Sequence, residues 1–119
     1  MTQQDKELLL KDLSGRLPYG VMFQCKYHNF PVKCIFIDTD YIGLEYRVNG
    51  QFFLHEIKPY LRPMSSMTEE EGREYRCLQV MRDIPWKVVD WLNTYHFDYH
   101  GLIEKGLALE APEGMYSLA

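Results

Sequence analysis

The sequence has no long hydrophobic run. The longest apolar run near the N-terminus covers residues 8–10, and charged residues lie directly on both sides of it. A secretory signal needs an apolar stretch of about 7–15 residues, and a membrane helix needs about 20. We therefore expect a cytoplasmic protein that does not enter the membrane.

Cysteines are few and form no recognisable motif. Cys25, Cys34 and Cys77 make an odd number, and no two of them have the CxxC spacing of zinc or redox sites. They do not fit the disulfide framework of a small secreted protein either. All three lie in apolar patterns, which favours free cysteines that act as small buried hydrophobic residues.

A strong net charge is also missing. The chain has 119 residues with a net charge of −4 and 46% hydrophobic residues, which is typical of one globular domain (residues 1–119). The charge is uneven, with +1 on residues 1–67 and −5 on residues 68–119. The acidic C-terminal half disfavours a nucleic-acid surface there, because phosphate contacts need clustered lysine and arginine.

The hydrophobic periodicity changes from helical to extended near residue 20. Residues 3–14 are predicted to form a helix that Thr2 caps and Gly15 ends. Alternating apolar residues then predict four β-strands, at residues 21–27, 32–38, 41–48 and 51–57. Asn49 and Gly50 favour a tight hairpin between the last two. We expect an antiparallel four-stranded meander, either open or curled into a barrel.

Two further helices are predicted after a loop at residues 58–66. Thr68 and Glu71 form a capping box that begins a helix ending near Arg82. Pro85 suits the first position of the next helix. Asn93 is expected to point away from the buried side of that helix. The residues predicted to form its buried stripe are Val88, Trp91, Leu92 and Tyr95.

Residues 97–119 are predicted to be a packed, irregular tail. Glycines divide this segment into short pieces, and its leucines favour packing on the domain. Asp98 is placed to cap a short helix that extends to Lys105. Together these elements predict an α+β fold with an N-terminal helix, the meander, two later helices and the tail.

His96, Asp98 and His100 form the segment most suggestive of chemistry. On one continuous helix the two histidines would share a face and could bind a metal, with Asp98 as a further ligand. However, a capping role for Asp98 would interrupt that helix, and no glutamate stands in an HExxH arrangement. We therefore expect surface histidines, no metal, no cofactor and no catalytic residue, since no cysteine or serine is placed beside a histidine either.

A basic and aromatic sheet face is a second candidate site. Lys26, Lys33 and Arg47 alternate with aromatic residues of the predicted strands, and such a face can stack bases of a single-stranded nucleic acid. The alternative is that these aromatic residues fill the core, because strands are rich in them.

The loop at residues 58–64 is a third candidate, for binding a protein partner. Tyr60, Arg62 and Met64 are residue types that are enriched at interfaces, and two prolines lower the entropy lost on docking. The alternative is an ordinary connector whose Tyr60 and Leu61 pack under the following helix.

Three segments resemble a known group of proteins. Residues 17–21, 58–68 and 96–103 are similar to segments of small uncharacterised proteins from gut-bacterial genomes, often encoded near prophage-like or other mobile elements. The resemblance implies a role in such an element, but no activity, cofactor or catalytic residue. Arginine often replaces His100 in that group, which disfavours a metal site.

Three functions therefore remain open. The first is a non-enzymatic binding or accessory protein of a phage-like element, acting through the sheet face or through Tyr60, Arg62 and Met64. The second is a small nucleic-acid-binding domain that uses Lys26, Lys33 and Arg47. The third is a metal-dependent enzyme with its site at His96 and His100.

Overall fold

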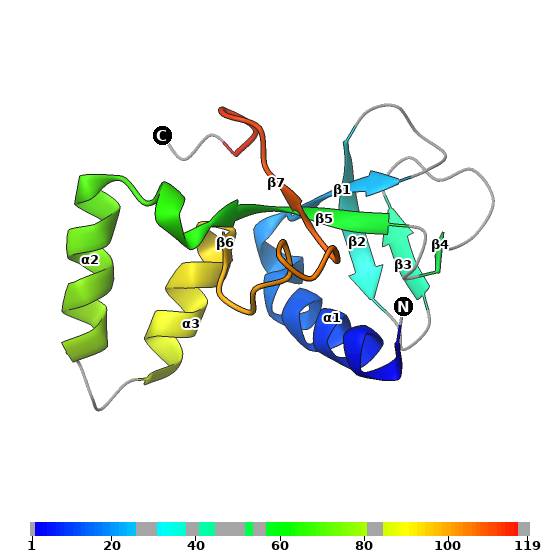
Figure 1. Ribbon diagram of the computed structural model, residues 1–119, viewed down its shortest axis with the longest axis horizontal. Coiled ribbons are helices and arrows are strands. Elements are labelled where there is room, and N and C mark those ends of the chain that lie inside the picture. The colour runs from blue at the N-terminus through cyan, green and yellow to red at the C-terminus, as the bar shows by residue number, and fades with distance from the viewer. Residues whose placement is uncertain are drawn as a thin grey trace.

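The protein has an α+β fold, as the sequence predicts (Figure 1). The computed structural model describes residues 2–25, 31–37, 41–44, 52–53, 57–80 and 85–116. Short 3₁₀ turns at Leu17–Tyr19 and Met64–Ser66 join some of its elements. Its helices and strands are α1 (Gln3–Arg16), β1 (Met22–Cys25), β2 (Val32–Ile37), β3 (Tyr41–Leu44), β4 (Phe52–Phe53), β5 (Ile57–Pro63), α2 (Glu69–Val80), α3 (Pro85–Thr94), β6 (Phe97–Asp98) and β7 (Leu109–Glu110).

The strands form a mixed sheet that does not close into a barrel. Their order is β4-β3-β2-β1-β5-β6, and β7 also pairs with β5. The neighbouring pairs from β1 to β4 are antiparallel, which confirms the predicted meander, with a register shift between Cys34 and Phe36. β6 and β7 run parallel to β5, so the predicted irregular tail adds two short strands to the sheet.

The prediction of a loop at residues 58–66 is wrong. Residues 58–63 belong to β5, the longest strand described, which returns to pair with β1 through Cys25↔Ile57 and Phe23↔Pro59. The alternation of strand residues is present, because Ile57, Pro59 and Leu61 are buried. Two prolines concealed it, since proline lacks the amide that a central strand uses. Pro59 is accommodated because the pairing of β5 with β7 begins at the next residue, Tyr60, which has an amide.

Helix α1 begins as predicted but ends later. The Thr2 hydroxyl accepts a hydrogen bond from the Asp5 amide at 3.0 Å. In return, the Asp5 carboxylate accepts one from the Thr2 amide at 3.3 Å. The helix continues through Gly15, and the left-handed residue is Gly20, with φ 70° and ψ 43°. Gly15 serves a close approach instead: a Cβ there would lie 2.7 Å from Nδ2 of Asn93 in α3.

The hydrophobic core consists of two clusters. The larger lies between α1, β1, β5 and the tail, and confirms that the tail packs on the domain. The smaller contains Trp91, Leu92 and Phe97, with residues of α2 and α3 around it. The buried members of the larger cluster are Leu9, Leu13, Val21, Phe23, Ile57, Leu61, Leu102, Leu107 and Ala108.

Two predictions about burial within the helices are wrong. Cys77 is exposed, although its place in an apolar pattern predicted a buried thiol. Asn93 is only 4% exposed, although helical spacing placed it away from the buried stripe. The reason is that α1 covers a second side of α3 at Gly15. The side chains of Cys25 and Cys34 lie outside the described part of the structure.

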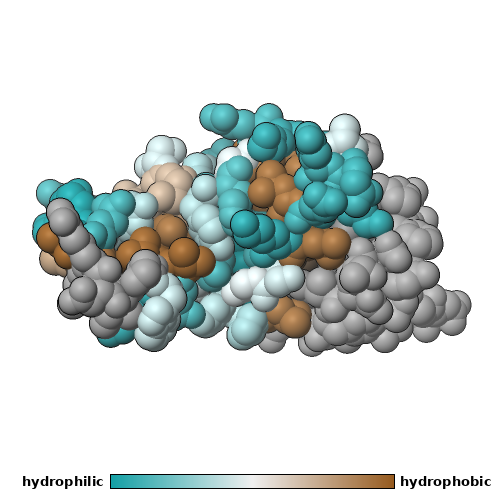
Figure 2. Space-filling view, turned by 90° about the horizontal axis from the view of Figure 1, so that it is seen from below, coloured by the Kyte–Doolittle hydropathy of each residue, from teal (hydrophilic) through white to brown (hydrophobic). Residues whose placement is uncertain are grey.

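Helices α2 and α3 carry exposed apolar residues on their outer surface. Val80 at the end of α2 and Trp86 and Val89 on α3 are 74%, 64% and 45% exposed. On the face seen in Figure 2, hydrophobic residues form several separate patches among hydrophilic ones. None of the helices in the described ranges has the length and hydrophobicity needed to span a bilayer.

A buried ion pair connects α1 to the segment that follows α3. Asp12 and Arg16 are both 0% exposed, and Arg16 donates from Nε and Nη2 to the two Asp12 oxygens at 2.5 and 3.0 Å. The same Nη2 donates to the Phe97 carbonyl at 2.6 Å. His100 Nδ1 lies 2.7 Å from Asp12 Oδ2. These bonds hold β6 against the helix.

We expect Arg16→Met to destabilise the fold strongly. The change leaves the Asp12 carboxylate buried without its guanidinium, and removing one partner of a buried pair costs about 3–5 kcal/mol. Chemical denaturation should show this loss. The double change Asp12→Asn with Arg16→Met should cost clearly less than the sum of the two single changes; additive losses would contradict the coupling.

Gly15→Ala should also destabilise, although alanine normally favours a helix by about 1 kcal/mol over glycine. The new Cβ would meet the buried Asn93 side chain, and such overpacking costs about 1–3 kcal/mol. Thermal or denaturant unfolding measures the net loss. In an Asn93→Ala background the same change should become neutral or stabilising, and an unchanged loss there would contradict this explanation.

Candidate acidic groove

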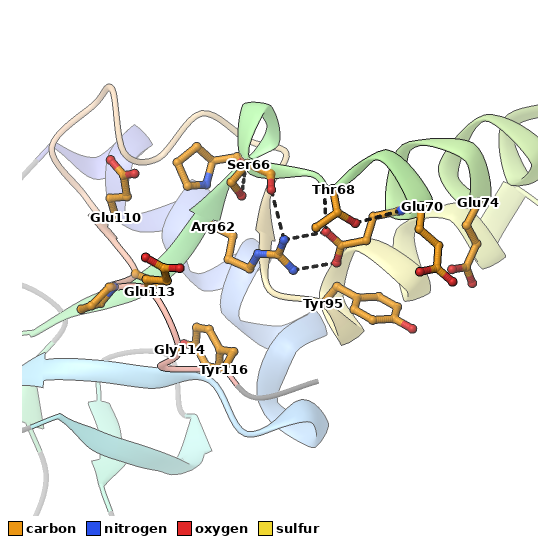
Figure 3. Close-up of a pocket in the computed structure, with 14 residues that line it drawn as sticks. Arg62, Ser66, Thr68, Glu70, Glu74, Tyr95, Glu110, Glu113, Gly114 and Tyr116 are labelled. Atoms are coloured by element: carbon orange, nitrogen blue, oxygen red, sulfur yellow. Dashed lines mark hydrogen bonds and ion pairs between the residues drawn. The ribbon is translucent and has the colours of Figure 1, made fainter. Parts of the chain in front are cut away.

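A groove of about 680 Å³ lies beside β5 (Figure 3). Helix α2 forms one wall, the segment after β7 forms the other, and Arg62 of β5 lies between them. Tyr95 closes part of the groove from the end of α3. The residues that line it are Arg62, Pro63, Ser66, Thr68, Glu70, Glu71, Glu74, Tyr95, Glu110, Ala111, Pro112, Glu113, Gly114 and Tyr116.

The α2 wall is built on the capping box that the sequence predicts. The Thr68 amide donates to Glu71 Oε1 at 2.9 Å, and the Glu71 amide donates to the Thr68 hydroxyl at 3.1 Å. The same Glu71 carboxylate receives two bonds from the Arg62 guanidinium, at 2.8 and 2.7 Å. These Arg62 bonds are the main reason why the pKa of Glu71 lies below its ordinary value. One carboxylate thus begins α2 and fixes the helix to β5.

Arg62 is held on its other side by an aromatic ring. Its guanidinium lies 4.2 Å from the centre of the Phe97 ring, at a distance suited to cation–π attraction. The side chains of Arg62 and Glu71 are only 16% and 14% exposed. The charge of Arg62 is therefore compensated inside the groove.

The opposite wall is a strap, which we define as residues 109–116. It is paired to β5 through β7 and through the Ala111 amide, which donates to the Leu61 carbonyl at 2.8 Å. At its far end the Tyr116 hydroxyl donates to the Tyr60 carbonyl at 2.6 Å and accepts from the Met22 amide at 2.9 Å. Burial raises the pKa of Tyr116 to about 12. The tyrosine therefore remains a neutral donor that fastens the strap.

Four further carboxylates make the groove acidic. Glu70 and Glu74 lie one helical turn apart on α2, and Glu110 and Glu113 lie on the strap across from them (Figure 3). All four are exposed, and none makes a hydrogen bond or ion pair with any described residue. Arg62 is the one basic residue among the lining residues and is already paired. Such a surface attracts cationic groups.

The three residues predicted to bind a partner have different positions. Arg62 lies in the groove, as described above. Tyr60 is half-buried on β5, and its carbonyl holds Tyr116. Met64 is half-buried and packs against the cluster of Trp91, Leu92 and Phe97. Only one of them thus lines the groove.

The three residues of the predicted histidine segment, His96, Asp98 and His100, have different environments in the structure. Asp98 accepts hydrogen bonds from the Leu102 and Ile103 amides at 2.9 and 3.0 Å, so it caps a series of turns instead of the predicted helix. His100 faces Asp12, whereas His96 is only 4% exposed. The prediction that both histidines lie at the surface is therefore wrong for His96. In the described part of the chain, no three His, Cys, Asp or Glu side chains are grouped to hold a metal.

The structure does not test the predicted nucleic-acid-binding residues. Lys26 and Arg47 lie outside the described residues, and Lys33 is described only as a backbone position of β2, opposite Met22. The basic and aromatic sheet face therefore stays a prediction.

Comparison of the chain with protein-family models, with curated proteins and with solved structures gave no match. The groove is therefore the feature of the molecule from which its function is inferred. Sequence reasoning missed the groove because its glutamates come from segments far apart in the chain. The one feature of the sequence that points to an acidic site is the excess of acidic residues after residue 67. Charge totals do not show that two acidic segments face each other.

Glu71→Gln should lower stability by about 1–3 kcal/mol, because it removes a charge-assisted pair with Arg62 while a glutamine still permits the capping box. Since the folded pKa is lowered, the contribution of Glu71 is present above its ordinary value of 4.5 and is lost as the pH falls through the folded pKa. Urea unfolding across acidic pH should show the two proteins converging. Glu69→Gln on the same turn is the control and should have little effect at any pH.

Proposed function

We propose that this protein is a non-enzymatic binding protein whose acidic groove holds a basic segment of a protein partner. The observation that supports this most directly is the pair of facing walls, each with two carboxylates that have no partner among the described residues. Unpaired like charges across a groove repel one another, and a cationic segment between them removes that repulsion.

The chemistry of the groove favours binding over catalysis. Among the described residues that line it there is no histidine, cysteine or lysine. The serine and the threonine of the lining have structural roles: Ser66 donates to the Pro63 carbonyl and Thr68 accepts from the Glu71 amide. The described lining therefore offers no cysteine or lysine nucleophile, and no serine or threonine beside a histidine base.

The size and charge of the groove suit a basic peptide segment and disfavour a nucleic acid. A volume of about 680 Å³ is within the range of about 300–1,000 Å³ that holds a compact ligand or a few side chains. Phosphate groups would be repelled by its carboxylates, so a nucleic acid does not suit it. The aromatic rings of Tyr95 and Tyr116 add apolar contact for the stems of lysine or arginine.

The resemblance to proteins encoded near prophage-like elements adds a biological context to this proposal. A partner with an exposed basic segment, encoded in the same element, would make the protein an accessory component of it. The acidic groove would then provide both attraction and orientation.

Binding can be tested with a fluorescent peptide of alternating lysine and glycine, measured by anisotropy at low and physiological salt. Two double variants each remove the negative charge of one wall. The first is Glu70→Gln with Glu74→Gln, and the second is Glu110→Gln with Glu113→Gln. We expect each to weaken binding by roughly three- to tenfold, with a reduced salt dependence, since each lost exposed charge pair is worth about 0.2–1 kcal/mol.

The matched control combines Glu69→Gln with Glu104→Gln, which removes the same charge from exposed positions outside the groove. Its affinity should equal that of the unchanged protein. If the control weakens binding as much as the wall variants do, the groove is not the site. Salt-dependent binding of single-stranded DNA in place of the peptide would favour the nucleic-acid alternative.

A further inference from the structure

His96 has an unusual position between the strap and the core. It is the one described residue other than glycine with a positive φ, 64°, a conformation that costs energy for a side chain of this size. Its ring is stacked on the Tyr116 ring, with the centres 3.6 Å apart and the planes 13° from parallel. Its Nδ1 is buried and has no hydrogen-bond partner among the described residues.

Two arginines lie near this imidazole, and their charges add to the effect of burial in lowering its pKa. The Arg62 amide donates to the His96 carbonyl at 2.7 Å, and Arg16 donates to the Phe97 carbonyl at 2.6 Å. Asp12 is already paired with Arg16, and Glu71 is already paired with Arg62. A proton on His96 would thus lose hydration and lie near the charges of Arg16 and Arg62, and the buried Nδ1 has no acceptor among the described residues.

The His96 ring also supports one wall of the acidic groove. The strap turns back at its end, where Gly114 has φ 82°, and Tyr116 anchors it to Tyr60 and Met22. Gly114 and Tyr116 both line the groove. If the histidine ring moved out, Tyr116 would lose its stacking partner and the strap would lose its support on that side.

We propose that the strap is an acid-sensitive latch, in which protonation of His96 separates its ring from Tyr116 and moves the strap wall away from the groove. Opening the latch would remove one acidic wall and so release the basic segment; this consequence rests on the function proposed above. The group that triggers it is distinct from the glutamates that contact the partner.

The direction of the pH effect follows from linkage. Burial first, and then the charges of Arg16 and Arg62, lower the pKa of His96 from 6.5 to about 4. The closed strap therefore binds the proton less well than an open strap does. It is fully stable above pH 6.5 and weakens as the pH falls toward 4, by at most about 300-fold in the opening equilibrium.

The test measures hydrogen exchange of the Ala111 amide, which bonds to Leu61 in the closed strap, in the free protein. Between about pH 7 and about pH 5, after correction for intrinsic exchange, its protection should fall by about 20-fold. The amide of Leu13 in the core helix α1 is the internal reference and should keep its protection. Parallel loss at Leu13 would mean global unfolding and would overturn the latch.

Two variants separate titration from packing. His96→Phe keeps an aromatic ring against Tyr116 but cannot be protonated, so Ala111 protection should no longer depend on pH in this range. His96→Asn suits a positive φ but removes the ring, so the strap should be open at both pH values. A pH-dependent loss in His96→Phe equal to that of the unchanged protein would refute the proposal. Because exchange needs no peptide, this outcome is independent of whether the groove binds one.

Discussion

The structure depends on the burial of two opposite charges at the end of α1. Asp12 and Arg16 are completely buried, and such charges are tolerated in an interior only when they are paired and hydrogen-bonded. Two of the partners come from the segment after α3, as the Phe97 carbonyl and the His100 ring. The requirement to satisfy these charges therefore fixes where that segment crosses the helix.

That position determines the geometry of the groove. β6 pairs with β5 through Arg62↔Phe97, so the Phe97 ring lies beneath the Arg62 guanidinium. Arg62 then holds Glu71 and with it the first turn of α2. Each arginine thus uses one carboxylate, which leaves the outer glutamates of α2 and the strap uncompensated on the surface.

The predictions that succeeded depend on neighbours in the chain. The caps at Thr2 and Thr68 and the order of strands β1 to β4 were all expected. The predictions that failed depend on contacts between distant segments. Gly15 lies inside its helix, where the Asn93 side chain approaches it, and Pro59 did not prevent a strand because β5 completes the sheet beside β1.

The candidate site shows the same division. The sequence by itself determined the three helices, the first four strands, the caps at Thr2 and Thr68 and the acidity of the C-terminal half, because these follow from spacing and composition. Only the tertiary structure decided that Glu70 and Glu74 line the same groove as Glu110 and Glu113, from the opposite side, and that His96 is buried beside Tyr116. The physical reason is that pairing of β6 and β7 with β5, and burial of Asp12 with Arg16, bring together residues whose separation along the chain carries no signal of their contact.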